Sequence, residues 1–522
     1  MELKIPRKWM WQFVMITCQR STLCLLALFA ACSENPASEE KVTVKASQPI
    51  SDEDSWKVFY INDQRVGFSH SRYRVIEEKG SQVVIFQQDS HMELKRFGKP
   101  LSLELLMQTR ESPNGDLLSY QFSIKNPPAD PTISQGTVEN GELKIDTSVA
   151  NQVRQSKLKW QPTYHSPSYL ERVFRKSPLK PGETQSFSIL LPEHNQVTEV
   201  TLSAKKYETI ELPDGSSDQC LHVVMQKSVM PGVNFDLYVN DGGAIIKESA
   251  DFLGATMVGF QATEAEALRK KTDKQLDFSV QGLIKTDAVK NMHNTEKVVY
   301  QISLPEGDPA KLFPSSDLQQ VKRRNEHQAE VTVFRAAVPK EFPESKVDAE
   351  YLSPSQFLQS DDPQIVKYAA TAVQSETDPW KQARLLENFV YRNLKKKNFS
   401  TALASASEVA RNMEGDCTEH AVLLAAMLRA QKLPSRVVVG FVYIPAVSSF
   451  VGHMWVEVFL DQRWIPLDAT LGKGGIGGGH LKMSASSLTE TAPAPLEIFL
   501  PILQSVGKLS IKVLDVSIPA TP

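Results

Sequence analysis

From Trp56 to about Phe260, polar and apolar residues alternate with a period of two, which is the pattern of half-buried β-strands. Asn-Gly and Asp-Gly pairs at positions 114, 140, 214 and 241 interrupt the alternation, as tight turns between antiparallel strands do. We therefore expect residues 52–262 to form one large, curved, antiparallel β domain. Residues 263–348 are expected to form a linker and a smaller β-rich segment, with strands near 298–304 and 329–334.

Composition restricts the classes of protein to which this chain can belong. Its 522 residues are 41% hydrophobic and 23% charged, which is ordinary for globular domains and excludes a protein that crosses a membrane many times. Lysine and arginine number 58 against 61 aspartate and glutamate, so the formal net charge is −3. Charge this balanced argues against a nucleic-acid partner.

The first 31 residues have the features of a secretory signal peptide. Cations at positions 4, 7, 8 and 20 precede the short apolar run at 23–31, which ends in small residues. Residues 28–32 (LFAAC) resemble a bacterial lipobox, whose cysteine, here Cys32, is lipidated and becomes the mature N-terminus. Phe29 departs from the usual leucine, so signal cleavage without lipidation stays open. Polar residues 32–51 then form a tether, and we expect an exported, periplasmic lipoprotein held at the membrane surface through Cys32.

Cysteines are few in the rest of the chain. Only Cys220 and Cys417 follow residue 32, and they lie in different segments. An exported chain of this size with so few cysteines is not built on disulfides. Cys220 begins an apolar strand, and we interpret it as a buried small hydrophobic residue.

Two helices are expected after residue 354. Aspartate-proline pairs at 362–363 and 378–379 place Asp at an N-cap and Pro in the first turn, which predicts helices at 363–374 and 379–394. In the second helix, four large apolar residues fall on one face at helical spacing. These residues are Leu385, Leu386, Phe389 and Val390.

The most informative cysteine precedes a strongly apolar helix. Gly415, Asp416 and Cys417 lead through Thr418, Glu419 and His420 into the run AVLLAAMLRA at 421–430, which is rich in helix formers. Cys417 is therefore expected at the N-terminus of a buried helix. The free N–H groups and the helix dipole there favour a negative charge and so lower the pKa of a thiol toward the nucleophilic thiolate.

A predicted hairpin follows this helix. After a strand at 436–443, residues 453–460 and 464–468 read as strands joined by a turn around Asp461 and Gln462. In that register His453 lies opposite position 470, and Asp468 is its diagonal neighbour on the same face. A slip by one residue would place the two on opposite faces. The pattern permits a Cys417 nucleophile, a His453 base and an Asp468 that orients the imidazole.

Three ordered motifs resemble the bacterial transglutaminase-like superfamily. They are GDCTEHA at 415–421, GHMWVEV at 452–458 and WIPLDAT at 464–470, with a glycine-rich stretch at 472–479. The resemblance covers about residues 350–490 and assigns the catalytic cysteine, histidine and aspartate to Cys417, His453 and Asp468. It implies a papain-like α+β core at 349–490, in which the nucleophile opens a helix packed on an antiparallel sheet, so the whole chain is predicted to be α+β. Supporting or oxyanion roles are expected among Asp416, Glu419, His420 and Trp455.

Several alternatives remain at this stage. Cys417, His420, His453 and His480 contain metal-binding side chains, but the helix-terminal thiol and the resemblance favour catalysis over zinc, so we expect no metal and no cofactor. The expected partner is a peptide or protein amide, and transfer of the acyl group to an amine or to water stays open. A non-catalytic envelope binding or carrier protein that uses the β-rich domain is the alternative function. The segment 491–522 is expected to pack on the catalytic domain, and the oligomeric state cannot be predicted.

Overall fold

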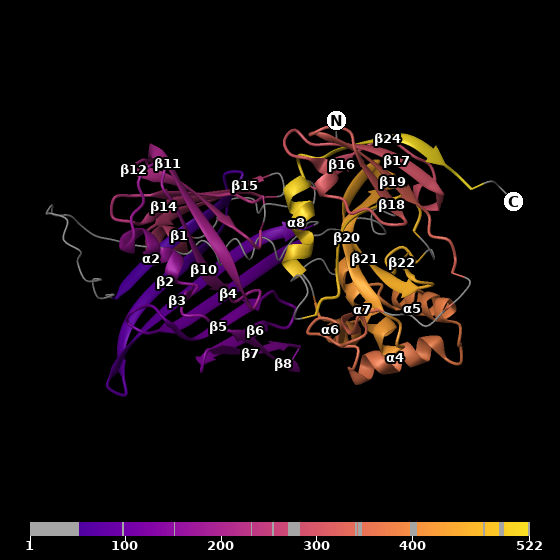
Figure 1. Cartoon of the computed structure of the whole chain (residues 1–522), viewed down its shortest axis with the longest axis horizontal. Coiled ribbons are helices and arrows are strands. Elements are labelled where there is room, and N and C mark those ends of the chain that lie inside the picture. The colour runs from indigo at the N-terminus through magenta and orange to yellow at the C-terminus, as the bar shows by residue number, and fades with distance from the viewer. Residues whose placement is uncertain are drawn as a thin grey trace. The chain divides into compact units, whose positions relative to one another are not determined.

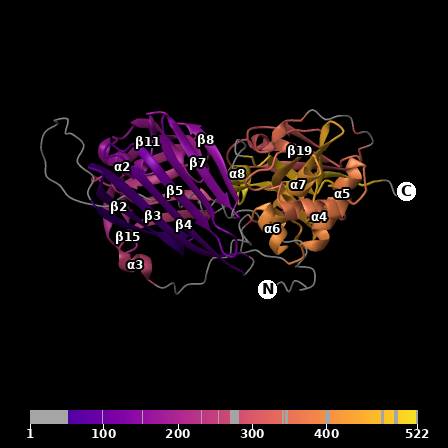
Figure 2. The ribbon, with the colours of Figure 1, turned by 90° about the horizontal axis from the view of Figure 1, so that it is seen from below.

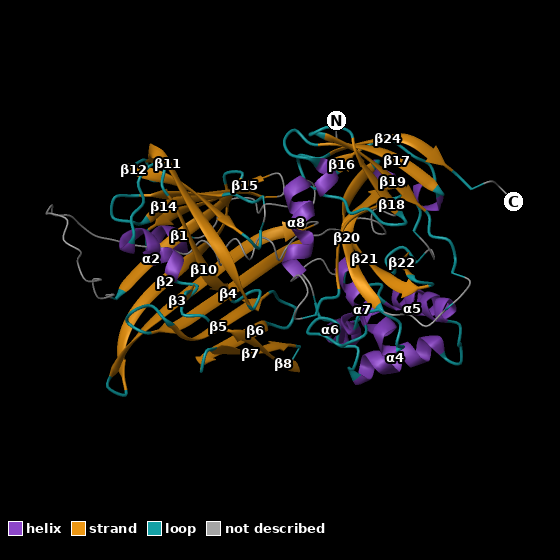
Figure 3. Cartoon of the chain, in the orientation of Figure 1, coloured by secondary structure: helices purple, strands orange, loops and turns teal. Residues whose placement is uncertain are grey.

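The computed structural model describes residues 52–519, apart from residues 97–98, 151, 231, 253–254, 270–281, 340–341, 343–346, 397–403, 473–475 and 490–494. The predicted signal peptide, the tether and Cys32 lie outside the described residues. Within them, large antiparallel sheets are accompanied by helices concentrated toward the C-terminus (Figures 1 and 3). The predicted α+β class is therefore confirmed. The chain divides into two compact units, whose described parts are residues 52–269 and 282–519.

The first unit is one strongly curved sheet of fifteen strands, whose strands run side by side in Figure 2. Neighbouring strands are antiparallel, except that β9 pairs with β10 in parallel. Alternate residues are buried along the strands, so the period-two pattern corresponds to one inward and one outward face. The helices of this unit are α2 (Tyr169–Lys176) and α3 (Glu264–Leu268). The strands, in chain order, are β1 (Glu53–Ile61), β2 (Gln64–Glu78), β3 (Ser81–Arg96), β4 (Lys99–Glu111), β5 (Leu117–Lys125), β6 (Thr132–Glu139), β7 (Glu142–Val149), β8 (Gln152–Lys159), β9 (Tyr164–His165), β10 (Thr184–Leu191), β11 (Gln196–Glu211), β12 (Ser217–Lys227), β13 (Phe235–Val239), β14 (Ile245–Phe252) and β15 (Ala255–Ala262).

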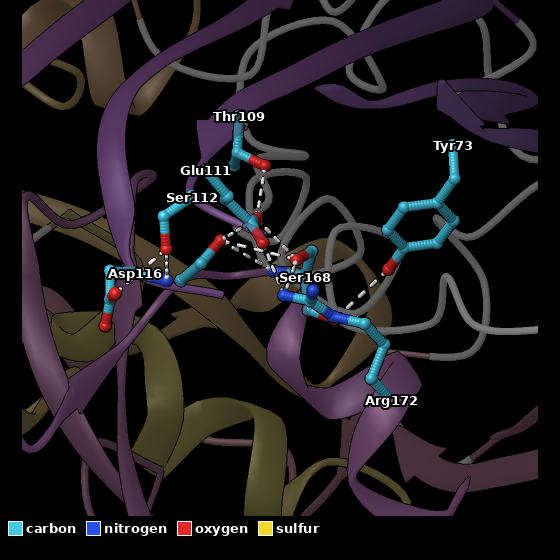
Figure 4. A network of polar contacts seen from close by, with 8 residues as sticks. Tyr73, Thr109, Glu111, Ser112, Asp116, Ser168 and Arg172 are labelled. Atoms are coloured by element: carbon cyan, nitrogen blue, oxygen red, sulfur yellow. Dashed lines mark hydrogen bonds and ion pairs between the residues drawn. The ribbon is translucent and has the colours of Figure 1, made fainter. Parts of the chain in front are cut away.

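Buried charges lie inside this first unit. Glu111, at the end of β4, is fully buried and accepts hydrogen bonds from the hydroxyls of Thr109, Ser166 and Ser168, while Arg172 of α2 forms an ion pair with it (Figure 4). A second pair joins Lys57 of β1 to Glu248 of β14, with Nζ and Oε2 2.9 Å apart. Burial raises the pKa of Glu248 to about 8 despite the opposing charge of Lys57.

The second unit combines two sheets with a group of helices. A five-stranded sheet has the order β16-β21-β20-β23, with β22 also paired to β21, and a four-stranded sheet has the order β18-β19-β17-β24. Helix α7 packs against β20 and β21, and α4, α5 and α6 pack around α7. The strands are β16 (Ile284–Lys285), β17 (Lys297–Ser303), β18 (Gln319–Arg323), β19 (Gln328–Phe334), β20 (Ser435–Ile444), β21 (Ser449–Leu460), β22 (Arg463–Leu467), β23 (His480–Ser486) and β24 (Ser510–Ser517). The helices are α4 (Pro363–Val373), α5 (Pro379–Asn393), α6 (Ala406–Asn412), α7 (Cys417–Ala430) and α8 (Pro495–Ser505), with short 3-10 turns that include η2 (Met292–Asn294).

The helix starts follow the predicted capping. Asp362 and Asp378 are the N-caps of α4 and α5, and each carboxylate accepts a backbone N–H of the first turn. Of the four large apolar residues on one face of α5, Leu386 and Val390 are buried, whereas Phe389 is partly exposed and Leu385 is 37% exposed. Glu387 is buried instead, since its carboxylate accepts the backbone N–H of Asp468.

The C-terminal segment belongs to the second unit through two contacts. Helix α8 packs against β23 and β20, and β24 forms an antiparallel pair with β17. Because β17, β18 and β19 share a sheet with β24, the small β-rich segment and the C-terminal segment form one compact unit with the helices. None of the helices in the described part of the chain is both long enough and apolar enough to cross a membrane.

Candidate active site

The start of α7 is fixed by a reciprocal capping arrangement. Asp416 is the N-cap, and its Oδ1 accepts the backbone N–H of Thr418 at 2.9 Å. In return, Oε2 of Glu419 accepts the backbone N–H of Asp416 at 2.9 Å. Gly415 precedes the cap with φ +150°, and a Cβ there would lie 2.3 Å from the Cβ of Glu419. Only glycine fits this entry, so the cap and the glycine together set the position of Cys417.

Glu419 and Asp416 form a buried acidic pair behind the helix start. Oε1 of Glu419 also accepts the backbone N–H of Ala404 at 3.0 Å, which ties α7 to the residues before α6. Burial and the neighbouring charge of Asp416 raise the pKa of Glu419 to about 8. Both carboxylates are occupied in capping, so their observed role is to hold the helix start.

Cys417 is the first residue of α7 and is completely buried. His420, one turn later, donates from Nδ1 to the backbone carbonyl of Asp416, which directs its ring to the helix start. The other cysteine of the described chain, Cys220, is buried in β12, where burial raises the pKa of its thiol to about 12. The two thiols therefore differ in setting: one opens a capped helix, and the other lies within a sheet.

The hairpin of β21 and β22 has the register expected from the sequence. Leu460 pairs with Arg463 and Val456 with Leu467, around a two-residue turn in which Asp461 and Gln462 both have positive φ. Asp468 follows the last pair and lies diagonally from His453. Nε2 of His453 and Oδ2 of Asp468 are 2.8 Å apart, so the predicted imidazole–carboxylate contact is present.

The Asp468 carboxylate is surrounded by hydrogen-bond donors. Oδ1 accepts the backbone N–H of Thr470 at 2.8 Å and that of Leu471 at 3.4 Å, while Oδ2 accepts from His453 and from His480, whose Nε2 is 3.1 Å away. Burial alone would raise the pKa of Asp468, but its interactions with His453 and His480 outweigh this effect and hold the pKa well below its usual range. The carboxylate is therefore ionised, and both imidazoles donate Nε2–H to it.

His453 consequently presents its other ring nitrogen as a proton acceptor. Nδ1 is buried and has no hydrogen-bond partner among the described residues. With Nε2 protonated, Nδ1 of the neutral ring carries a lone pair. His453 lies on β21, the strand that packs against the cysteine-bearing helix α7. The Trp455 ring stacks beside His453 at a centroid distance of 6.0 Å, so Trp455 forms part of the wall around the imidazole.

Two residues of this cluster were not foreseen in these roles. The sequence suggested His480 only as a possible zinc ligand, and it suggested no functional role for Glu387. Glu387 reaches Asp468 from α5, 81 residues earlier, whereas His480 lies 12 residues after Asp468, at the first residue of β23. The only signal in the sequence was a charged residue within the apolar face of α5 and a histidine after the glycine-rich stretch.

One group of described side chains has the composition of a metal site. His453, Asp468 and His480 offer three ligand atoms within 4.8 Å of one another, and two imidazoles with a carboxylate suit zinc or iron. The Nε2 atoms of both histidines are already hydrogen-bonded to Asp468, so these two ligand atoms have partners without a metal ion. Cys417 and His420 do not join them in a metal-binding group among the described residues. The four residues considered as zinc ligands from the sequence therefore do not form one metal-binding group among the described residues.

Comparison with known proteins places a family match on this part of the chain. Residues 366–469 match the model of the transglutaminase-like superfamily. No significant match was found among the curated proteins.

Solved structures show more distant likenesses. A candidate cysteine protease from Cytophaga hutchinsonii is 16% identical, with a TM-score of 0.28 over 44% of this chain and 90% of its own. The periplasmic domain of TgpA from Pseudomonas aeruginosa, bound to ethylmercury, is 17% identical, with a TM-score of 0.22 over 35% of this chain and 92% of its own. A β-barrel-like protein from Brucella abortus with a domain of unknown function is 12% identical, with a TM-score of 0.30 over 41% of this chain and 96% of its own. These identities and TM-scores are too low to indicate a particular chemistry.

Proposed function

We propose that this chain, which carries a transglutaminase-like domain at residues 366–469, is a cysteine enzyme that breaks amide bonds through a thioester on Cys417. The observation that supports the proposal most directly is the orientation of His453. Its Nε2–H is held by the ionised carboxylate of Asp468, and its buried Nδ1 is left as a proton acceptor. This is the tautomer that a general base beside a thiol requires.

The first half of the reaction forms the thioester. Nδ1 of His453 takes the proton of Cys417, and the thiolate attacks the carbonyl carbon of the amide. The oxyanion that develops is stabilised by the backbone N–H of Cys417, because the N-terminal end of a helix carries the positive end of the helix dipole and favours a negative charge. The imidazolium then gives its proton to the departing amine as the carbon–nitrogen bond breaks.

The second half resolves the thioester. An amine or a water molecule attacks the carbonyl carbon, Nδ1 of His453 accepts the proton of the attacking group, and the thiolate of Cys417 leaves. An amine gives acyl transfer, whereas water gives hydrolysis, as in a peptidase or amidase. The same three side chains serve both outcomes, so the substrate class we propose is a peptide or protein amide with either acceptor.

His453, and not His480, is proposed as the base because of its position. Both rings donate to Asp468, and Nδ1 of His480 is also without a partner among the described residues. The strand that carries His453 packs against α7, which Cys417 opens. His480 instead begins β23, which pairs with β20 on the side away from β21.

Reaction of Cys417 with iodoacetamide, followed by peptide mass spectrometry, tests the proposal. At about pH 7 we expect the wild-type Cys417 peptide to react at least about 10-fold faster than that of His453→Ala, because the imidazole holds the thiolate. The Cys220 peptide is the internal control and should react slowly in both proteins. Equal Cys417 rates in wild type and His453→Ala would contradict the proposal.

The acceptor is identified with a glutamine-containing test protein and a fluorescent primary amine. Incorporation of the amine indicates transfer, and ammonia release without incorporation indicates hydrolysis. Both signals should be lost in Cys417→Ala and retained in Cys220→Ala. Signals that persist in Cys417→Ala would show that another group carries the reaction.

Attachment to the envelope membrane through Cys32 belongs to the same proposal. The lipobox-like residues 28–32 support it, and the polar stretch 32–51 would give the folded units reach from the surface. Mass spectrometry of the mature N-terminus tests this directly. A diacylated Cys32 is the expected result, whereas an unmodified or absent Cys32 contradicts the anchor and leaves the chemistry of Cys417 unaffected.

A further inference from the structure

The carboxylate of Asp468 is shared by two histidines, which is more than a three-residue catalytic arrangement requires. Oδ2 lies 2.8 Å from Nε2 of His453 and 3.1 Å from Nε2 of His480. His480 is 3% exposed and Asp468 is equally buried, so neither contact is exchanged for water at the surface. Charge-assisted hydrogen bonds to a buried carboxylate are among the strongest in proteins.

The sheet is shaped so that His480 can reach this carboxylate. His480 begins β23, which lies beyond β20 from the His453 strand. At the intervening strand, Gly440 pairs with His453, and a Cβ on Gly440 would lie 2.0 Å from the backbone oxygen of Leu481. A side chain at position 440 would therefore push β20 and β23 apart at the point where His480 enters the cluster.

The surroundings of His480 favour its neutral form. Burial lowers the pKa of His480, and the contact with Asp468 offsets this only in part. The titratable groups around it are His453 on β21, Asp468 after β22, and His293 on η2, whose ring centroid is 5.6 Å away, while Glu387 of α5 holds the backbone of Asp468 from behind. A neutral His480 adds a donor to Asp468 without placing a second positive charge beside His453.

We infer that His480 is a positioning residue for the proposed reaction: its Nε2–H fixes the Asp468 carboxylate so that this carboxylate holds His453 with Nδ1 free to take the proton of Cys417. The inference rests on the proposed function and deepens it by adding a residue that acts only through Asp468. The Asp468 carboxylate is then held by backbone N–H groups at one oxygen and by two imidazoles at the other. Loss of His480 would leave the carboxylate less constrained and the imidazolium of His453 less stabilised.

The test is the pH dependence of Cys417 alkylation by iodoacetamide in the full chain, with EDTA present to remove metal ions. Support of the imidazolium lowers the pKa of the paired thiol, so loss of that support moves the midpoint toward the value of a free thiol, about 8.5. We expect His480→Leu to raise the midpoint by about one pH unit and to slow alkylation near pH 7 by about 10-fold. His480→Gln retains an amide N–H of similar reach and should restore most of the rate.

The matched control is His293→Leu, which removes a buried imidazole next to His480 that donates to the backbone of Tyr443 and not to Asp468. Its midpoint should stay at the wild-type value. If His480→Leu does not fold, His480→Asn, whose shorter amide stops short of Asp468, takes its place.

Two outcomes would overturn the inference. An unchanged midpoint in His480→Leu would make His480 a structural residue, and a shift as large as that of His453→Ala would make it the base itself. Failure of the proposed function would give a different result, because the pH midpoint of Cys417 alkylation would then be the same in the wild type and in His453→Ala.

Discussion

Both units of the chain bury a carboxylate, but they use it in opposite ways. In the first unit, Glu111 receives three hydroxyl groups and the guanidinium of Arg172, which also donates to the Ser168 hydroxyl (Figure 4). In the second unit, Asp468 receives two imidazoles, and each ring has a second nitrogen, Nδ1, without a partner among the described residues. Hydroxyl and guanidinium groups do not change their protonation state near neutral pH, whereas imidazole does.

The difference between the Glu111 and Asp468 clusters indicates how a buried carboxylate that only stabilises the fold can be told apart from one that supports a reaction. Burial and ion pairing are common to both clusters, so neither property identifies a site. The distinguishing feature is a donor whose remaining ring nitrogen can accept a proton, on a strand that packs against the helix opened by a thiol. By this criterion Glu111 joins β4 to α2, while Asp468 is proposed to orient a base.

The largest expected effect is that of Asp468→Asn. The variant presents an amide to two Nε2–H groups, so His453 changes to the tautomer protonated on Nδ1 and can no longer take the proton of Cys417. We expect the burst of p-nitrophenol from p-nitrophenyl acetate to slow about 10³–10⁴-fold, with a stability loss of only about 1 kcal/mol. A burst within about 10-fold of the wild-type rate would contradict the comparison drawn from Asp468.

Glu111→Gln is the corresponding change in the first unit. We expect it to lower the stability of that unit and to leave the reactivity of Cys417 unchanged. Arg172 would be left buried beside an amide, and breaking such a pair costs about 3–5 kcal/mol. Hydrogen exchange resolved by peptide should show faster exchange across β4 and α2, while the rate of Cys417 alkylation stays unchanged. Slower alkylation of Cys417 in fully folded Glu111→Gln would contradict the proposal that Glu111 stabilises the fold and has no part in the reaction.

The two units should also respond to pH in opposite directions. The folded-state pKa of Glu248 is raised to about 8, so the stability it contributes is present below about 4.5 and is lost as pH rises through about 8. Asp468 has a lowered pKa, so its contribution is present above about 3.9 and is lost as pH falls through the folded-state value.

Between about pH 5 and about pH 9 we therefore expect β14 to lose up to about 4 kcal/mol of protection from hydrogen exchange. In Glu248→Gln this dependence should be much flatter. If the protection of β14 depends on pH as strongly in Glu248→Gln as in the wild type, another buried acid causes the effect.

The smallest effect concerns two glycines. Gly415→Ala combines a positive φ with a contact of 2.3 Å to Glu419, and we expect a loss of about 3 kcal/mol together with slower alkylation of the adjacent Cys417. Gly80→Ala in the β2–β3 turn has φ +78° and no atom within 4 Å of the new Cβ, so about 1 kcal/mol and unchanged alkylation are expected. Thermal unfolding of the two variants measures the stabilities, and equal effects would show that crowding at Glu419 does not matter.

Local patterns predicted the elements that carry the proposed chemistry. Capping residues and apolar runs located α4, α5 and α7, and the turn at Asp461 and Gln462 predicted the register in which His453 meets Asp468. These features depend on neighbours within a few residues, which is why they can be derived from one sequence.

Tertiary contacts were beyond such reasoning. Leu385 belongs to the apolar face of α5 and is nevertheless exposed, whereas Glu387 is buried because its partner is the backbone of Asp468, far along the chain. His480 likewise has meaning only through the pairing of β23 with β20, which brings it to Asp468. Helix periodicity and residue type carry no information about partners of this kind.

The two-residue turn between β21 and β22 determines which insertions this region can tolerate. Asp461 and Gln462 already form the shortest common hairpin connection, with both residues at positive φ. One added residue that shifted the pairing by a single position would turn the carboxylate to the opposite side of the sheet from His453, and the β-strands would still form. Natural or engineered versions of the domain with one residue added at this hairpin should therefore keep the fold and lose the proposed activity.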